Sequence, residues 1–169
     1  MNVYPIEAGN FKLDGGAMFG VVPKSLWTKT NPADADNMIE MSSRCMLVEN
    51  SDKLILVDTG MGDKQSEKFF KYYKRWGSDN LVKSINSAGF SIDDVTDVLL
   101  THLHFDHCGG AVAWDSTKEA YDVLFKNANY WSNENHWDWA TSPNPREKAS
   151  FLDENLFPIK ESGQLKFIN

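Results

Sequence analysis

Cysteine is scarce in this chain of 169 residues. Cys45 and Cys108 are the only two, too few for the disulfide framework of a small secreted domain. Long apolar runs are lacking as well, since no stretch approaches the roughly 18 residues that a membrane-spanning helix needs. The first residues also lack the basic and then apolar pattern of a secretory signal. Together these features predict a cytoplasmic protein in a reducing environment, without a membrane partner.

Positive charge is in short supply too. Lys and Arg number 17 against 24 Asp and Glu, which gives a formal net charge of −7. This balance argues against nucleic acid or an anionic membrane as the main partner. The length predicts one domain spanning 1–169. A hydrophobic content of 41% is ordinary for a globular domain with a core.

The pattern of apolar residues predicts a mixed α/β chain. Alternating or continuous apolar runs predict extended segments at 2–13 (as a hairpin turning at Gly9 and Asn10), 18–22 (a strand or a loop), 43–49, 53–58, 95–101, 123–125, 128–131, 156–159 and 165–168. Helical spacing predicts helices at 64–76, 80–88, 132–140 and 146–155. The polar stretch 24–37 has no period and is expected to be a loop.

The stretch Thr101–Gly110 carries the clearest chemical signal. It contains three of the four histidines, His102, His104 and His107, together with Asp106. On an extended backbone, positions i and i+2 point to the same side, so the first two imidazoles can meet one ion. The side chains of Asp106 and His107 follow where the chain turns, so they can approach the position of a second ion. Imidazole and carboxylate donors suit Zn²⁺, and also Fe, Co, Ni or Mn.

The roles of the residues around this stretch are less specifically indicated by the sequence. Asp58 follows the buried run 54–57 and precedes glycines, so it either lies beside an active site or caps a turn. Cys108 is expected to be structural, and His136 to be pocket wall or surface rather than a ligand. Several aromatic residues could line an apolar pocket or belong to the core: Phe19, Trp27, Phe105, Trp137 and Trp139.

The motifs of this chain resemble those of a known family. His-x-His-x-Asp-His, followed by x-Gly-Gly and preceded by an apolar strand and Thr101, is similar to the signature of the metallo-β-lactamase superfamily. Leu-Val-Asp-Thr-Gly at 56–60 matches that family's second recurrent element. The motif at 103–110 and the segment 146–151 most resemble the lactonase-like hydrolases. The resemblance implies an αββα sandwich, of which this chain would supply the N-terminal αβ half.

The resemblance also implies a site with two divalent metal ions, with zinc as the first choice. His102 and His104 would hold one ion, and Asp106 and His107 the other, with Asp58 behind them to orient the cluster. A metal-bound hydroxide would attack the carbonyl of an ester, lactone or related small-molecule substrate. Asp106 would act as the catalytic residue that orients this hydroxide and passes a proton to the leaving oxygen.

The chain also departs from the family pattern. The family's remaining ligands, a third His, a bridging Asp and a last His, come from the second half of the fold, and after the motif this sequence holds only His136. We therefore expect a domain that is incomplete at the C-terminus, with its other half on the same or another polypeptide, and with an apolar sheet face exposed. A homodimer is a further option.

Two alternative functions remain open at this point. One is a mononuclear iron dioxygenase of the same fold. The other is a non-catalytic remnant that binds metal or a partner. The diiron branch of the family has Glu in place of the second His, so His104 argues against it.

Overall fold

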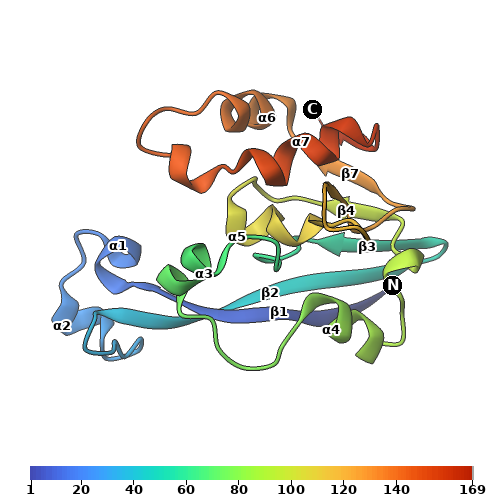
Figure 1. The fold of residues 1–169 in the computed structure, drawn as a ribbon. Helices are drawn as coiled ribbons and strands as arrows, with labels where there is room; N and C mark the ends of the chain where they lie inside the picture. Colours follow the sequence, from blue (N-terminus) through green and yellow to red (C-terminus); the bar gives the residue numbers. More distant parts are fainter. Residues whose placement is uncertain (169) are drawn as a thin grey trace.

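The chain is built around one mixed sheet, seen in the computed structural model in Figure 1, which describes residues 1–168. Within this range six strands are hydrogen-bonded in the order β1-β2-β3-β4-β7-β8. Their bounds are β1 (Asn2–Asp14), β2 (Met38–Asn50), β3 (Lys53–Val57), β4 (Asp97–Leu99), β7 (Asn129–Ser132) and β8 (Leu165–Phe167). A separate antiparallel pair consists of β5 (Val112–Trp114) and β6 (Tyr121–Val123).

Short helices lie between the strands. They are α1 (Gly15–Phe19), α2 (Lys24–Trp27), α3 (Glu67–Tyr73), α4 (Leu81–Ser87), α5 (Phe105–Cys108), α6 (Glu134–Thr141) and α7 (Asp153–Glu161). Three 3₁₀ turns accompany them at Ile92–Asp94, Gly109–Ala111 and Lys148–Ser150. The predicted α/β class is therefore confirmed. None of the helices in the described part of the chain is long and apolar enough to cross a membrane.

The sheet changes from antiparallel to parallel partway across. β1, β2 and β3 form an antiparallel meander, whereas β4, β7 and β8 are each parallel to the preceding neighbour in the sheet. The carboxyl ends of β3, β4 and β7 consequently meet at one edge of the sheet. In open α/β sheets this edge is where ligands bind. The loop after β4 is the histidine-rich stretch.

One face of the sheet carries the main core. Alternate strand residues Leu47, Leu56, Val98 and Tyr130 are fully buried there. Helices α4, α6 and α7 pack onto the same core, with Ile85 as the fully buried contribution of α4. Figure 1 shows α6 and α7 together on one side of β7 and α4 beside β1 and β2. This burial holds the strands, and hence the loops that follow them, in a fixed register.

The opposite face is apolar but much less covered. Met46 pairs with Val57, Val57 with Leu99, and Leu99 with Trp131, so these four side chains form a row across the sheet. Met46 is exposed and the other three are half-buried. A second row brings Val3, Val48 and Ile55 together. Large apolar surfaces of this kind usually mark an interaction site.

Some of the expected elements are wrong in detail. Residues 2–13 form no hairpin: β1 is one long strand, whose register against β2 shifts between Glu7 and Asn10. Gly9 takes a positive φ of 134° there, so it serves a β-bulge rather than a turn. The apolar run 18–22 starts in helix α1, and the expected loop 24–37 begins with helix α2.

The C-terminal third also differs from expectation. Helix 146–155 is replaced by the turn Lys148–Ser150 and by α7, and 156–159 is helical rather than extended. Leu156 and Ile159 are three positions apart and both fully buried, so helical burial outweighs the Pro158 between them. The strand pair at 43–49 and 53–58 and the extended segment at 165–168 are confirmed.

Candidate metal centre

The histidine-rich loop leaves the sheet immediately after β4. Leu100 still donates its N–H to the Trp131 carbonyl of β7, at 3.0 Å. Thr101 lies in a bend, and His104 is the N-cap of α5, with extended backbone angles of φ −66° and ψ 148°. Asp106 and His107 then lie in the single turn of α5. His102 and His104 therefore precede the first residue of α5, and Asp106 and His107 lie within it.

The four side chains lie close together. The ring centroid of His102 is 4.7 Å from that of His104 and 3.9 Å from that of His107. Asp106 Oδ2 is 3.6 Å from Nε2 of His107. Burial, together with the neighbouring histidines, lowers the pKa of His102 to about 4. This imidazole is therefore neutral at neutral pH, as a metal ligand must be.

The donor set matches the requirements of zinc. Imidazole nitrogen and carboxylate oxygen are its common ligands. Within residues 1–168, no three His, Cys, Asp or Glu side chains are arranged as a group around one ion. The ring of His102 lies near those of both His104 and His107, and Asp106 lies near His107. Two ions fit this arrangement if each takes further ligands from elsewhere.

Asp58 connects the end of β3 to the ligand loop. Its Oδ2 accepts a hydrogen bond from Nδ1 of His107 at 2.8 Å, and its carboxylate also accepts from the N–H and hydroxyl of Thr101. Burial alone would raise the pKa of Asp58, but the bonds from His107 and Thr101 lower it overall. The same bond raises the pKa of His107. With Nδ1 occupied, Nε2 of His107 is left free for a metal.

Two loops behind the ligands pack backbone against backbone. Thr59 donates its N–H to the His107 carbonyl at 2.8 Å, and Gly110 donates to the Gly60 carbonyl at 2.9 Å. A Cβ on Gly109 would lie 2.2 Å from the Met61 carbonyl oxygen. Only glycine allows this approach. Backbone contacts between the Asp-Thr-Gly motif at 58–60 and the Gly-Gly motif at 109–110 therefore fix the position of the loop that carries the histidines.

Lys64 also holds this loop, which the sequence did not indicate. Its Nζ donates to the Gly109 carbonyl at 2.5 Å, and the residue is buried. Burial lowers the pKa of Lys64 to about 8. The sequence placed it at the start of the helix predicted for 64–76. In the structure it precedes α3, and no local pattern distinguishes it from its neighbours.

An aromatic cluster lies next to the candidate ligands. Phe105 contacts Phe69 of α3 with ring centroids 5.3 Å apart, and Tyr73 at 4.9 Å. The other aromatics proposed from the sequence do not gather here. Phe19 stacks on Trp27 at 5.0 Å, whereas Trp137 belongs to the main core and Trp139 is exposed. Of those five residues, only Phe105 lies beside the site.

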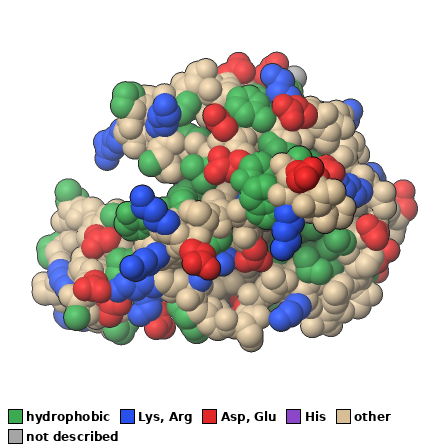
Figure 2. Space-filling model, in the orientation of Figure 1, with side chains coloured by type: hydrophobic (Ala, Val, Ile, Leu, Met, Phe, Trp, Pro, Cys, Tyr) green, Lys and Arg blue, Asp and Glu red, His purple; other side chains and the backbone are tan. Residues whose placement is uncertain are grey.

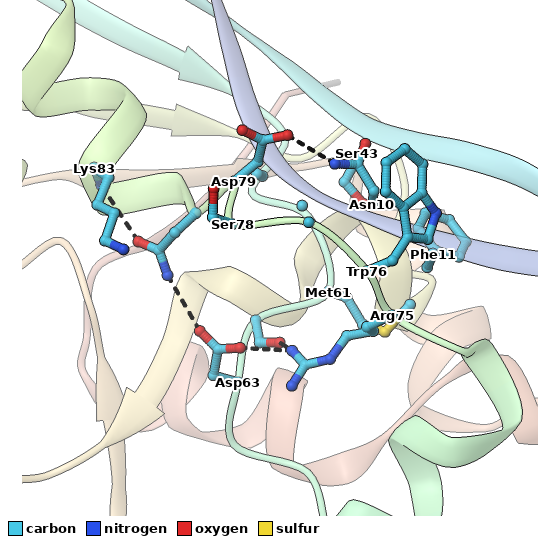
Figure 3. Close-up of a pocket in the computed structure, with 15 residues that line it drawn as sticks. Asn10, Phe11, Ser43, Met61, Asp63, Arg75, Trp76, Ser78, Asp79 and Lys83 are labelled. Atoms are coloured by element: carbon cyan, nitrogen blue, oxygen red, sulfur yellow. Dashed lines mark hydrogen bonds and ion pairs between the residues drawn. The ribbon is translucent and has the colours of Figure 1, made fainter.

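A small cavity lies beside two of the four candidate ligands. It has a volume of about 140 Å³ and is lined by Asp58, Asp106 and His107 together with residues of β1 and β2. A second cavity of about 290 Å³, shown in Figure 3, contains no histidine. There Arg75 is already paired with Asp63 at 2.6 Å, and Asn10 with Asp79 at 2.7 Å. Of these two cavities, only the smaller one is therefore lined by candidate metal ligands.

Both thiols are buried, and their chemistry can be predicted. Burial raises the pKa of Cys45 and of Cys108 to about 12, from a reference of 9.0. Because the thiolate is the reactive form, this shift lowers the reactive fraction of each thiol at pH 8 by about 1000-fold, and burial also keeps reagents away. We expect an aromatic disulfide reagent to label neither thiol of the native chain within minutes, and both in denaturant. Rapid labelling of one thiol in the native chain would contradict the buried positions.

Comparison with known proteins agrees with these motifs. Residues 39–165 match the family model of the metallo-beta-lactamase superfamily. The chain therefore belongs to the metallo-β-lactamase superfamily, as its motifs indicated. A curated relative is an N-acyl homoserine lactonase of Bacillus cereus, 29% identical over 104 residues, which cover 56% of this chain and 40% of the relative.

Solved structures give the same answer for the fold. A probable metal-dependent hydrolase from Staphylococcus aureus superposes with a TM-score of 0.89 and 30% identity, covering 99% of this chain and 58% of that one. AidC, a dizinc quorum-quenching lactonase, has a TM-score of 0.71 and 26% identity, with 99% and 57% covered. The expected metallo-β-lactamase-type fold is confirmed. The chain spans about two fifths of its curated relative and under three fifths of these structures.

Proposed function

We propose that this chain carries the first four ligands of a dinuclear, metal-dependent hydrolase. His102 and His104 would hold one ion, and Asp106 and His107 the other. The observation that carries the proposal is the 2.8 Å bond from His107 Nδ1 to Asp58, while Nε2 of the same ring lies 3.6 Å from Oδ2 of Asp106. Bound divalent ions, with zinc as the best match to the donors, would polarise a carbonyl and lower the pKa of water.

Individual residues of the chain would take part in proton transfer, ligand positioning and substrate binding. Asp106 is partly exposed beside His107, so its carboxylate can orient an attacking water and later give a proton to the leaving oxygen. Asp58 would hold the His107 ring in place. Phe69, Tyr73 and Phe105 would contact an apolar part of the substrate next to Asp106.

The substrate class that we propose is a lactone or related ester. Support comes from the relatives, which include an N-acyl homoserine lactonase and a dizinc quorum-quenching lactonase. An acyl lactone combines a hydrolysable carbonyl with an apolar chain, and the aromatic cluster suits the second part. N-hexanoyl-homoserine lactone is therefore a suitable test substrate.

We further propose that the active unit contains a second αβ layer on the apolar sheet face. Met46, Val57, Leu99 and Trp131 form a row there that a second sheet could cover. The second layer would also supply the further ligands that two ions require. The second layer would lie on the same or another polypeptide. A homodimer formed through the apolar sheet face is the alternative, and light scattering distinguishes it by its mass.

A fusion provides the test. Residues 1–169 are joined to the part of the Staphylococcus aureus hydrolase that this chain does not match, and the fusion is loaded with Zn²⁺. We expect ring opening of N-hexanoyl-homoserine lactone that stops when a chelator removes the metal. A folded, zinc-loaded fusion that opens no lactone or ester, or opens one equally well after chelation, would contradict the proposal.

A further inference from the structure

We propose that His136 is a positioning residue, which fixes the peptide between the two candidate ligands His102 and His104. Nε2 of His136 accepts the backbone N–H of Leu103 at 2.9 Å. The inference rests on the proposed metal site. It assigns a role in that site to the fourth histidine, which would itself bind no metal.

The backbone at Leu103 requires a partner from outside the sheet. β4 ends at Leu99, and Leu100 makes the last bond to β7, with the Trp131 carbonyl. The side chain of Leu103 is fully buried in the main core, so its N–H lies in a protein interior where an unpaired donor is costly. His136 replaces the strand partner that the sheet no longer provides.

The fold delivers this imidazole to the loop. Leu99 pairs with Trp131, so the end of β7 lies beside the end of β4. Helix α6 starts two residues after β7, with Asn133 as its N-cap accepting the N–H of His136 at 3.2 Å. The ring is thus carried on the first turn of a capped helix. The two residues joined by the bond are 33 positions apart.

Phe151 packs against both His104 and His136. Its ring centroid lies 4.9 Å from that of His104 and 5.9 Å from that of His136, edge-on in both cases. Phe151 is 7% exposed, and it is part of the main core. One buried ring therefore supports both the candidate ligand and the residue that we assign to position it.

The hydrogen bond requires one particular tautomer of His136. As an acceptor at Nε2, the imidazole must be neutral and must carry its proton on Nδ1. A side chain that fills the same space but has no hydrogen-bond acceptor cannot replace His136. Glutamine can place its carbonyl oxygen near the position of Nε2, whereas leucine has similar bulk and no acceptor. This pair of substitutions separates hydrogen bonding from packing.

The test compares His136→Leu, His136→Gln and the control Asn135→Ala, an exposed residue of the same helix. The 169-residue chain is titrated with Zn²⁺ alone, against a chromophoric chelator. We expect His136→Leu to weaken Zn²⁺ binding about 10-fold, at the lower end of the loss for residues behind a ligand. His136→Gln should stay within about 3-fold of the original chain, and Asn135→Ala should not change it.

Two readouts need no metal. In the metal-free chain the Leu103 amide should exchange at least 10-fold faster with solvent in His136→Leu than in the original chain, and ¹⁵N spectra should show His136 protonated on Nδ1. Equal Zn²⁺ affinity of the original chain and His136→Leu would overturn the positioning role, as would His136→Gln behaving like His136→Leu. A folded original chain that binds no Zn²⁺ would instead refute the proposed function, whatever the Leu103 amide shows.

Discussion

Replacing His104 with Ala is expected to weaken Zn²⁺ binding more than 100-fold. We propose that His104 shares one ion with His102, and the ring centroids of the two residues are 4.7 Å apart. Loss of an outer residue behind a metal ligand costs about 10- to 100-fold in affinity, and loss of a ligand itself should exceed this. The measurement is competition with a chromophoric chelator, combined with metal analysis.

The control for this substitution is Tyr72→Ala. Tyr72 is an aromatic residue of α3 that is 68% exposed, so its removal should change neither metal binding nor folding. A zinc affinity of His104→Ala equal to that of the original chain would exclude His104 as a ligand. Metal analysis of the complete site also tests the oxygenase alternative, since one iron per site would favour it.

Replacing Asp58 with Asn should weaken Zn²⁺ binding by about 10- to 100-fold. Asp58 has a left-handed backbone, with φ 59°, which Asn tolerates better than most residues. The substitution therefore keeps the fold and one acceptor for Thr101, but removes the charge that orients His107. A Zn²⁺ affinity of Asp58→Asn within 2-fold of the original would contradict the role assigned to Asp58.

The same substitution has a signature in the metal-free chain. The folded pKa of Asp58 is lowered from 3.8 and that of His107 is raised from 6.5. The contribution of Asp58 to stability is therefore lost as pH falls through its folded pKa, and that of His107 is lost as pH rises through its folded pKa. Asp58→Asn should reduce the free energy of unfolding in urea more at pH 5 than at pH 8. A larger loss at pH 8 would contradict the ion pair.

That the four candidate ligands lie close together was predictable from the sequence, for a physical reason. His102, His104, Asp106 and His107 fall within six consecutive positions, so their proximity needs no long-range information. Lys64 and His136 act on backbone atoms 45 and 33 residues away. No local periodicity encodes such contacts.

The errors in the fold have the same origin. Gly9-Asn10 has the composition of a turn, but pairing with β2 continues on both sides and makes it a bulge. Pro158 suggests the end of a helix, yet burial of Leu156 and Ile159 on one side keeps α7 helical. In both cases tertiary burial outweighs local preference, whereas the hairpin of β2 and β3 agrees with both and was predicted.

The most direct test of the proposal that this chain holds only part of the metal site is the activity of the chain by itself. The purified 19.1 kDa chain is loaded with Zn²⁺, its mass in solution is measured by light scattering, and opening of N-hexanoyl-homoserine lactone is followed. Because the second αβ layer and the further ligands would be missing, we predict no hydrolysis above that of free Zn²⁺, and recovery of activity in the fusion. A stable, monomeric 19.1 kDa species with full hydrolase activity would contradict the account.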